Sequence, residues 1–497
     1  MTDQQYNDWL KSQSAVRCVL IEADVKTGGS VVTRYLSNRG YTTSPTDTPA
    51  NTSYSPRVVG GIKFTRSLST DGSVSLGWGD IELNNTDGSL DSWIDDYWAN
   101  RDIKFYLGDM SWPRSDFRQV FAGTITGIDT RKRDRVNIKL SDKLQRLNYP
   151  MTESKLGGST SLADSLKPLL FGECHNIEPL LIDATVNEYM VHDGAIERII
   201  EVRDNGVPVS ITTTLGTGKF RLVNAPSGTI TVSAQGLQMP TSPLTGGTTV
   251  YKNTIAELIA YIVTTYGGVT KFSSADLDVS SLTAFNTANP QPVGLYLKDR
   301  TNILEVCNQL ASSIGARMVI GNTGLMSLVK LTLPQATAGT SITSSDFVDR
   351  SIEITSLADV VASVKIGYDK NYTVQSDLTT GILQEHAALF AEEWLTYTQT
   401  DSATASNYNL YTDPDMEETN LLTVSDASAE AARRLTLWST QRKIIKYQGF
   451  YHLIFETLGD SQTITHNRFG LSGGKRGQII SISIDWLSPY IDFQVLV

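Results

Sequence analysis

Cysteine and histidine side chains, which are common protein ligands of zinc, are few in this chain and far apart. The cysteines are Cys18, Cys174 and Cys307, and the histidines stand at positions 175, 192, 386, 452 and 466. No two histidines have the spacing that puts two ligands on one helix face, and a metal site needs three or four convergent ligands. We therefore predict no metal ligands and no cofactor, with three free thiols and a surface imidazole beside a buried Cys174.

Serine, histidine and aspartate occur throughout the chain, but the sequence does not arrange them as a recognisable hydrolase triad. Two glycine-lysine segments, Gly473-Gly-Lys475 and Gly218-Lys219, resemble fragments of phosphate-binding loops. Neither has the earlier glycine at the required distance, and neither has Ser or Thr after the lysine. We interpret both segments as turns and predict no catalytic residues.

Paired acids and tryptophans are the remaining candidates for chemistry, because glycoside hydrolysis uses two carboxylates across a sugar-binding cleft. The pairs are Asp95-Asp96, Glu392-Glu393 and Glu417-Glu418. Neighbouring residues on a strand point to opposite faces, so we predict solvated surface for these acids. The candidate sugar platforms are Trp78, Trp93, Trp98, Trp112, Trp394, Trp438 and Trp486. We expect most of them in the core, with Trp112 left open.

The length and composition limit the classes of protein to which this chain can belong. The chain has 497 residues, which suggests three or four domains, and a net charge of -11 from 53 acidic and 42 basic residues. This balance argues against a protein whose main task is binding phosphates. The acidic N-terminus lacks the pattern of a signal peptide, and no run of 18 apolar residues occurs, so we expect assembly in the cytoplasm and no membrane span.

The C-terminal stretch has the clearest secondary-structure pattern. Ala427, Ala431, Leu435 and Trp438 recur at helical spacing, which predicts a helix over 425–440 capped by Ser425 or Asp426. Farther on, Ile480, Ile482, Ile484 and Trp486 alternate with polar residues, as in a half-buried antiparallel strand. We divide the chain into a strand-rich region 1–150, a region of β-hairpins 151–250 around the Asn205-Gly206 turn, a helical α/β region 251–335, and a strand-rich region 336–497.

Several segments, taken in order, resemble tail-hub proteins (baseplate hub or tail-tip proteins) of long-tailed bacteriophages. The resemblance lies in the types and spacing of the following residues: Asp80-Ile-Glu-Leu83, Asp87-Gly-Ser-Leu-Asp91, Arg101-Asp-Ile103, Gly108-Asp109, Val120-Phe-Ala-Gly-Thr-Ile125, Phe171-Gly172, Asn176, Pro179, Asp204-Asn-Gly-Val-Pro208, Gly236, Asn302-Ile-Leu304, the helix Asp426 to Leu437, Leu458-Gly-Asp460, Arg468-Phe-Gly-Leu471, Gly474-Lys475 and Ile482-Ser-Ile-Asp-Trp-Leu487. The resemblance covers nearly the full length.

The resemblance implies a mainly β fold with α+β segments: two β-barrel-like domains, at 1–150 and 336–497, with a β-rich domain at 151–250 and an α/β domain at 251–335 between them. It implies a structural, non-enzymatic virion protein that forms a homotrimeric ring at the distal end of the tail. The implied partners are the distal tail protein, tail tube, tape-measure protein and the central spike or tail fibre, with roles in host attachment and genome ejection.

Two other functions stay open: a receptor-binding adhesin and a virion-associated carbohydrate-degrading enzyme. For a ring, the acidic net charge further predicts a negative lumen through which DNA passes without specific binding, because like-signed walls repel phosphates. Candidate lumen acids are Asp413, Asp415, Glu417 and Glu418, or Asp95 and Asp96.

Overall fold

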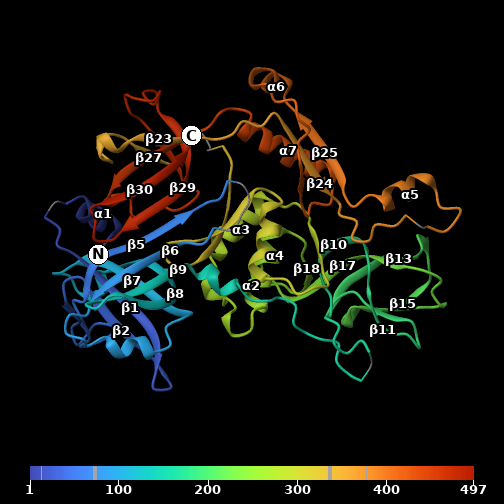
Figure 1. The fold of residues 1–497 in the computed structure, drawn as a ribbon, viewed down its shortest axis with the longest axis horizontal. Helices are drawn as coiled ribbons and strands as arrows, with labels where there is room; N and C mark the ends of the chain where they lie inside the picture. The colour runs from blue at the N-terminus through green and yellow to red at the C-terminus, as the bar shows by residue number, and fades with distance from the viewer. Residues whose placement is uncertain (13, 71–74, 160, 334–338, 377) are drawn as a thin grey trace. The chain divides into compact units, whose positions relative to one another are not determined.

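The computed structural model describes residues 1–12, 14–70, 75–159, 161–333, 339–376 and 378–497, and its chain forms two compact units (Figure 1). Unit 1 consists of Met1–Arg146, Val319–Asp359 and Gln441–Val497, and unit 2 consists of Leu147–Met318 and Val360–Thr440. Both units are built from segments that are distant in the sequence. The division into four domains expected from the sequence remains a prediction.

Unit 1 is organised around one large sheet. Its strands follow the order β2 (Ser30–Ser37), β1 (Arg17–Thr27), β7 (Arg101–Asp109), β8 (Arg118–Lys132), β9 (Arg135–Ser141), β6 (Trp78–Asn84), β5 (Val58–Ser67), β29 (Lys475–Asp485), β30 (Tyr490–Leu496), β27 (Lys443–Phe450) and β23 (Glu353–Leu357). Strand β28 (Ser461–Ile464) also pairs with β29, and β22 (Thr340–Ile342) pairs with β28. The short pair β3 (Tyr41–Thr42) and β4 (Ser53–Tyr54), helix α1 (Asp3–Lys11) and strand β21 (Met326–Lys330), which pairs with β20 (Ala316–Ile320), also belong to the unit.

The alternation predicted for the C-terminal strands is confirmed. Along β29, Ile482 and Ile484 are buried while Ser481 and Ser483 are half-buried, and Trp486 continues the buried side just after the strand. Strand β30 repeats the pattern with Ile491, Phe493 and Val495. Since period-two alternation gives a strand one apolar face, β29 can pack on a core while its other face stays polar.

The two ends of the chain meet within the sheet of unit 1. Strand β29 pairs antiparallel with β5, placing Ser483 opposite Thr65, and their hydroxyl oxygens lie 2.8 Å apart. The mainly β fold is confirmed. Among the described residues, however, the strand order is an open path from β2 to β23, so neither end region closes into a separate barrel. The β-barrel-like part of the prediction is replaced by one sheet shared by both ends.

Unit 2 contains three β-sheets and most of the helices in the described chain. The first sheet has the order β14 (Val207–Pro208), β13 (Ile196–Asp204), β17 (Ile230–Thr241), β10 (Leu169–Ile177) and β19 (Gly294–Leu297), with β18 (Thr248–Tyr251) beside β17. The second has the order β11 (Leu180–Asp183), β12 (Glu188–Met190), β16 (Lys219–Leu222) and β15 (Ile211–Thr214). The third has the order β25 (Leu395–Thr400), β24 (Ser363–Tyr368) and β26 (Met416–Glu418). Its helices are α2 (Ile255–Thr265), α3 (Val279–Ala288), α4 (Ile303–Ser312), α5 (Gln384–Ala391), α6 (Ser402–Tyr408) and α7 (Val424–Trp438).

Helix α7 is the helix that the sequence places at 425–440. It begins one residue earlier, because the side chain of Thr423, and not of Ser425 or Asp426, accepts the capping hydrogen bond from the Asp426 backbone N–H. Its buried stripe, Ala427, Ala431 and Leu435, packs against Val364 and Ile366 of β24. Contrary to the predicted stripe, Trp438 is only half-buried.

Two short connections also match the sequence. Asn205 and Gly206 have φ of 46° and 84° and form the turn between β13 and β14, as predicted from the Asn-Gly pair. In the described part of the chain, no helix is both long and apolar enough to cross a membrane.

Candidate functional site

The first sheet of unit 2 has one apolar face and one polar face. On the apolar face, Val202 of β13 and Val232 and Ala234 of β17 belong to a buried core cluster. Their neighbours Arg203 and Thr231 lie opposite each other across the strand pair, as do Glu201 and Ser233. Directly opposed residues of antiparallel strands project to the same side, so these four side chains share the polar face.

A chain of polar contacts runs across this polar face. Arg198 donates from Nε to Gln235 Oε1 at 3.1 Å, and Gln235 donates from Nε2 to Glu173 Oε2 at 2.6 Å. The ring of His175 then lies between two carboxylates, with Nε2 3.0 Å from Glu173 and Nδ1 2.6 Å from Asp369. The hydrogen bond to Asp369, together with the charges of both acids, raises the pKa of His175 to about 9. A protonated His175 therefore ties β10 to the segment that follows β24.

That segment covers the polar face. Asn176 of β10 donates to the side-chain oxygen of Asn371 at 2.7 Å, and Asn371 donates in turn to the backbone carbonyl of Phe390 at 3.0 Å. The guanidinium of Arg203 lies 4.9 Å from the centre of the Phe390 ring, within the range of a cation–π contact. These contacts fix the end of α5 over the β13 and β17 strands.

A pocket of about 200 Å³ remains between the polar face and α5. Its lining combines polar groups of the sheet with an apolar side from α5 and β25, and consists of His175, Asn176, Glu201, Arg203, Thr231, Ser233, Asp369, Asn371, His386, Leu389, Phe390, Glu392 and Leu395. We call this space the His175 pocket. Thr231 is only 1% exposed, and its hydroxyl has no hydrogen-bond partner among the described residues.

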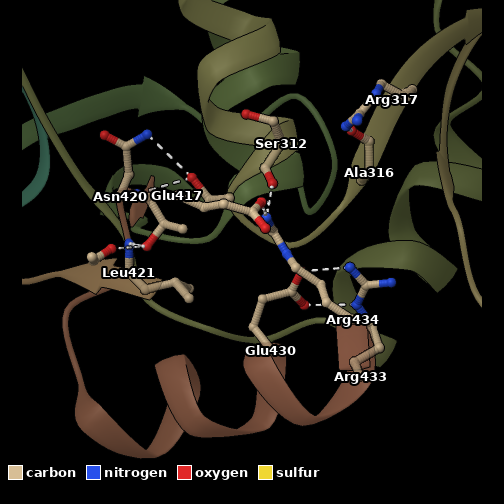
Figure 2. Close-up of polar contacts among 12 residues, drawn as sticks. Ser312, Ala316, Arg317, Glu417, Asn420, Leu421, Glu430, Arg433 and Arg434 are labelled. Carbon is tan, nitrogen blue, oxygen red and sulfur yellow. Dashed lines mark hydrogen bonds and ion pairs between the residues drawn. The ribbon is translucent and has the colours of Figure 1, made fainter. Parts of the chain in front are cut away.

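A second polar cluster joins α7 to α4 within unit 2 (Figure 2). Glu430 is almost fully buried and accepts from Arg433 Nε at 2.7 Å and from Arg434 Nε at 2.7 Å. Arg434 also forms an ion pair with Glu417 of β26 and donates to the backbone carbonyl of Ser312 at 2.9 Å. We call these five residues the α7 cluster.

The contact with Ser312 has a clear electrostatic basis, because the last carbonyls of a helix lack intrahelical donors and carry the negative end of the helix dipole. Arg434 supplies both a donor and a positive charge at the end of α4. Burial, with a smaller effect from the nearby Arg317, lowers the pKa of Arg434 to about 10, so the guanidinium stays charged at neutral pH. The cluster is a tie between elements and holds no group arranged for catalysis.

The residues considered as chemical candidates are separated by the fold. The three cysteines are buried and unpaired with one another. Burial lowers the pKa of His192 to about 4, and its Nδ1 accepts from the Leu170 backbone N–H at 2.9 Å. Within the described ranges, no group of three or more His, Cys, Asp or Glu residues is placed to hold a metal ion. His175 is not a simple surface imidazole, since it is held between Glu173 and Asp369.

The glycine-rich segments lie in strand connections. Gly470-Leu471-Ser472-Gly473-Gly474 has the Gly-x-Ser-x-Gly spacing of a nucleophile elbow, although we predicted no catalytic residues. It lies between β28 and β29, whereas the serine of a nucleophile elbow lies between a strand and a helix. Gly218 has φ of 63° and leads into β16. Both segments are therefore turns, as the sequence suggested.

The predicted surface acids and core tryptophans show mixed outcomes. Asp95, Asp413, Asp415, Glu417 and Glu418 are exposed, and Asp96 is half-buried beside Arg34. Trp98, Trp394 and Trp486 are buried, and Trp93, Trp112 and Trp438 are half-buried. Trp78 is the exception, because it is 68% exposed on β6 and was expected in the core.

The His175 pocket was missed by sequence reasoning. Its sheet residues do carry a signal, since Glu201 and Arg203 alternate with Ile200 and Val202 at the period of a strand. Nothing in that alternation indicates which distant segment covers the polar face. The covering residues Asp369 to Leu395 lie more than 130 positions farther along the chain than Thr231 and Ser233.

Solved structures that resemble this chain are tail and virion proteins. One is the 43 kDa tail protein of prophage MuSo2 from Shewanella oneidensis, with 10% identity, a TM-score of 0.39 and coverage of 96% of this chain and 97% of that chain. A tail protein from Neisseria meningitidis MC58 has 7% identity, a TM-score of 0.39 and coverage of 97% and 96%. A chain of the virion of a native gene transfer agent particle has 12% identity, a TM-score of 0.46 and coverage of 71% and 91%.

No family model matches the sequence, and no curated protein matches it either. At these identities and TM-scores, the similarity to the solved structures assigns no function to this chain. Any functional assignment has to come from the residues and contacts of the chain itself.

Proposed function

We propose that this chain is a structural protein of a bacteriophage tail, and more specifically a baseplate hub at the distal end of the tail. The observation that carries the proposal is a contact between two segments that resemble the hub family. Trp486, from the segment Ile482 to Leu487, packs against Phe121, from the segment Val120 to Ile125, with ring centres 5.5 Å apart. Phe105 of β7 completes the group, 4.9 Å from Trp486 and 4.7 Å from Phe121.

This contact makes the resemblance more than a set of separate short matches. The segments that resemble the family at the two ends of the chain occupy β6, β8 and β29, which belong to the same sheet. A protein that merely shared isolated turns with the family would have no reason to bring them into one aromatic core. Fold alone does not determine function, so the proposal rests on this residue-level correspondence.

The proposed hub is a homotrimeric ring. Among the described strands, β2 and β23 end the main path of the sheet of unit 1 and β22 ends its branch through β28, and open sheet edges favour pairing with a further chain unless they are covered. A closed ring of identical subunits covers such edges without leaving a growing filament. The ring would bind the tail tube and distal tail protein on one side and the spike or fibres on the other.

The proposed ring lets DNA pass without holding it. The exposed acids Asp413, Asp415 and Glu418 and the net charge of -11 support a lumen that repels phosphates. If purified protein bound duplex DNA tightly and in a salt-sensitive manner, the negative lumen would be wrong. We also propose that the chain has no catalytic role, which peptidase and glycosidase assays of the purified protein test.

Electron microscopy of intact particles tests the hub directly. Density for the chain should lie at the distal end of the tail, on its axis, with threefold symmetry. Density for the chain along the tail shaft or on the capsid, instead of at the distal end, would exclude the hub. A twofold or strictly sixfold ring would retain a tail role and reject the trimer.

A further inference from the structure

We propose that the His175 pocket binds a single sugar ring, as a neutral hexose or N-acetylhexosamine of a surface glycan. This inference does not depend on the hub assignment, because it rests on the lining of one pocket within unit 2. The pocket's volume of about 200 Å³ lies below the range of about 300–1,000 Å³ typical of sites for drug-sized ligands. The space suits one ring and not an extended ligand.

The charges of the lining disfavour an anionic ligand. Arg203 donates from Nε to Glu201 at 2.5 Å and from Nη1 to the Gly206 carbonyl at 3.2 Å. His175 is held by Glu173 and Asp369 as described above. Two cations, Arg203 and His175, thus face three carboxylates, so an anionic ligand would find no uncompensated cation among these groups.

The lining groups that can still form hydrogen bonds with a ligand are mainly hydroxyls. Thr231 is almost fully buried, and its hydroxyl lacks a partner among the described residues. Buried polar groups nearly always form hydrogen bonds, so an unpaired hydroxyl in a pocket wall requires an explanation. Ser233 lies two residues along the same strand and accepts from the Asn176 backbone N–H at 3.2 Å, which leaves its own proton available for donation. A ligand hydroxyl can bond to both side chains.

The opposite side of the pocket is apolar. Leu389, Phe390 and Leu395 line it, and Leu389 is 45% exposed on α5. A sugar ring has a C–H face and a rim of hydroxyls, so it can place one against the leucines and the other against Thr231, Ser233 and the Glu201 carboxylate. Small-molecule sites commonly combine an apolar wall with a few placed polar groups in this way.

The test uses the full-length purified protein and a panel of free hexoses and N-acetylhexosamines, with saturation-transfer NMR to detect binding and calorimetry to measure it. Thr231→Val should weaken the affinity for the bound sugar roughly threefold to tenfold, the effect of losing one hydrogen bond. The same change removes an unsatisfied buried hydroxyl, so the variant should fold and unfold no more readily than the parent. Thr213→Val, at an exposed position of β15, is the matched control and should leave sugar affinity unchanged.

A second variant tests the apolar side of the pocket and leaves the residues of the sheet unchanged. Leu389→Gln keeps a good helix former in α5 and should also weaken sugar binding several-fold, whereas Leu383→Gln, at the exposed start of α5, should not. Saturable binding that both pocket variants weaken would support the proposal. It would be overturned if no sugar of the panel bound saturably, or if the pocket variants bound as tightly as the parent.

Discussion

Strands β29 and β30 of unit 1 and strands β13 and β17 of unit 2 follow the same pattern and use it differently. Both pairs are antiparallel and place alternate apolar residues on a core. In β29 the alternate residues are small and polar, such as Ser481 and Ser483. In β13 and β17 they include Glu201 and Arg203, which lie beneath α5 and line a pocket. Period-two alternation therefore identifies the core side of a strand, but it does not distinguish a solvated polar face from a covered one.

The comparison also separates two ways of holding distant segments together. In unit 1 the ends of the chain are joined by backbone pairing and by aromatic packing around Trp486. In unit 2 distant segments are joined by charged contacts at His175 and at Arg434. Aromatic burial is insensitive to pH and salt, whereas charged contacts depend on both. Variants in the two regions should therefore differ in how much they lower the free energy of unfolding. The losses should also differ in how they depend on pH and salt.

The largest effect is expected at Trp486. Trp486→Ala should lower the free energy of unfolding by about 3–5 kcal/mol, because it leaves a cavity beside Phe105 and Phe121. Urea-induced unfolding measures the change. Trp78→Ala is the matched control, since Trp78 is 68% exposed and its loss should change stability by about 0.5 kcal/mol or less. Equal losses for both variants would contradict the central position of Trp486.

The next effect is expected in the α7 cluster. Glu430→Gln should cost about 3 kcal/mol, because it removes a buried carboxylate and leaves the partly buried Arg433 and Arg434 without their shared partner. Glu418→Gln, at an exposed position of β26, supplies the control for loss of a charge alone. The two variants are compared by urea denaturation at neutral pH. A Glu430 variant as stable as the control would show that the Glu430 carboxylate is not needed to compensate the two arginines of the cluster.

Local sequence predicted much of this architecture, because local chemistry determines it. The alternation of Ile482, Ile484 and Trp486, the stripe of Ala427 and Ala431, and the Asn205-Gly206 turn each depend on neighbouring residues only. The resemblance at both ends of the chain suggested the right class of fold.

The covered polar face and the shared sheet were not predictable in the same way. The contact between His175 and Asp369 joins residues separated by 194 positions, and the hydrogen bond from the Ile62 backbone N–H to the Asp485 carboxylate, beside the β5 and β29 pairing, joins residues separated by 423. Separate β-barrel-like ends were expected because each strand-rich region was considered alone. Which distant segment covers an open edge or face depends on the whole fold, so neither the pocket nor the shared sheet has a local signature.

A smaller effect, with a distinctive pH dependence, is expected at His175. Its folded-state pKa of about 9 lies above the ordinary value of 6.5, so its contacts stabilise the fold fully below about pH 6.5 and are lost as the pH rises through 9. Because the side chain is about one-third exposed, solvent screening reduces the contribution to about 1–2 kcal/mol. His175→Gln should remove this part of the pH dependence, whereas the exposed His386→Gln should retain it. Unfolding measured at pH 6 and pH 9.5 distinguishes the two variants. If His175→Gln lost as much stability between these pH values as the parent, the proposed role of His175 in holding its two acidic partners would be wrong.

The smallest effect is expected for the pair Lys365 and Asp413, which has the same chemistry as the α7 cluster but a different environment. The two charged atoms lie 3.3 Å apart, and the Asp413 side chain is 80% exposed. Water screens such a pair and its side chains lose freedom on pairing, so Asp413→Asn should change the free energy of unfolding by about 0.5 kcal/mol or less. That small change should disappear in 1 M salt, where the Debye length is about 3 Å, whereas the loss in Glu430→Gln should largely persist because the Glu430 carboxylate is buried. Unfolding of both variants at low and high salt makes the comparison. A loss at Asp413 as large as that at Glu430 would mean that burial does not determine which ion pairs hold unit 2 together.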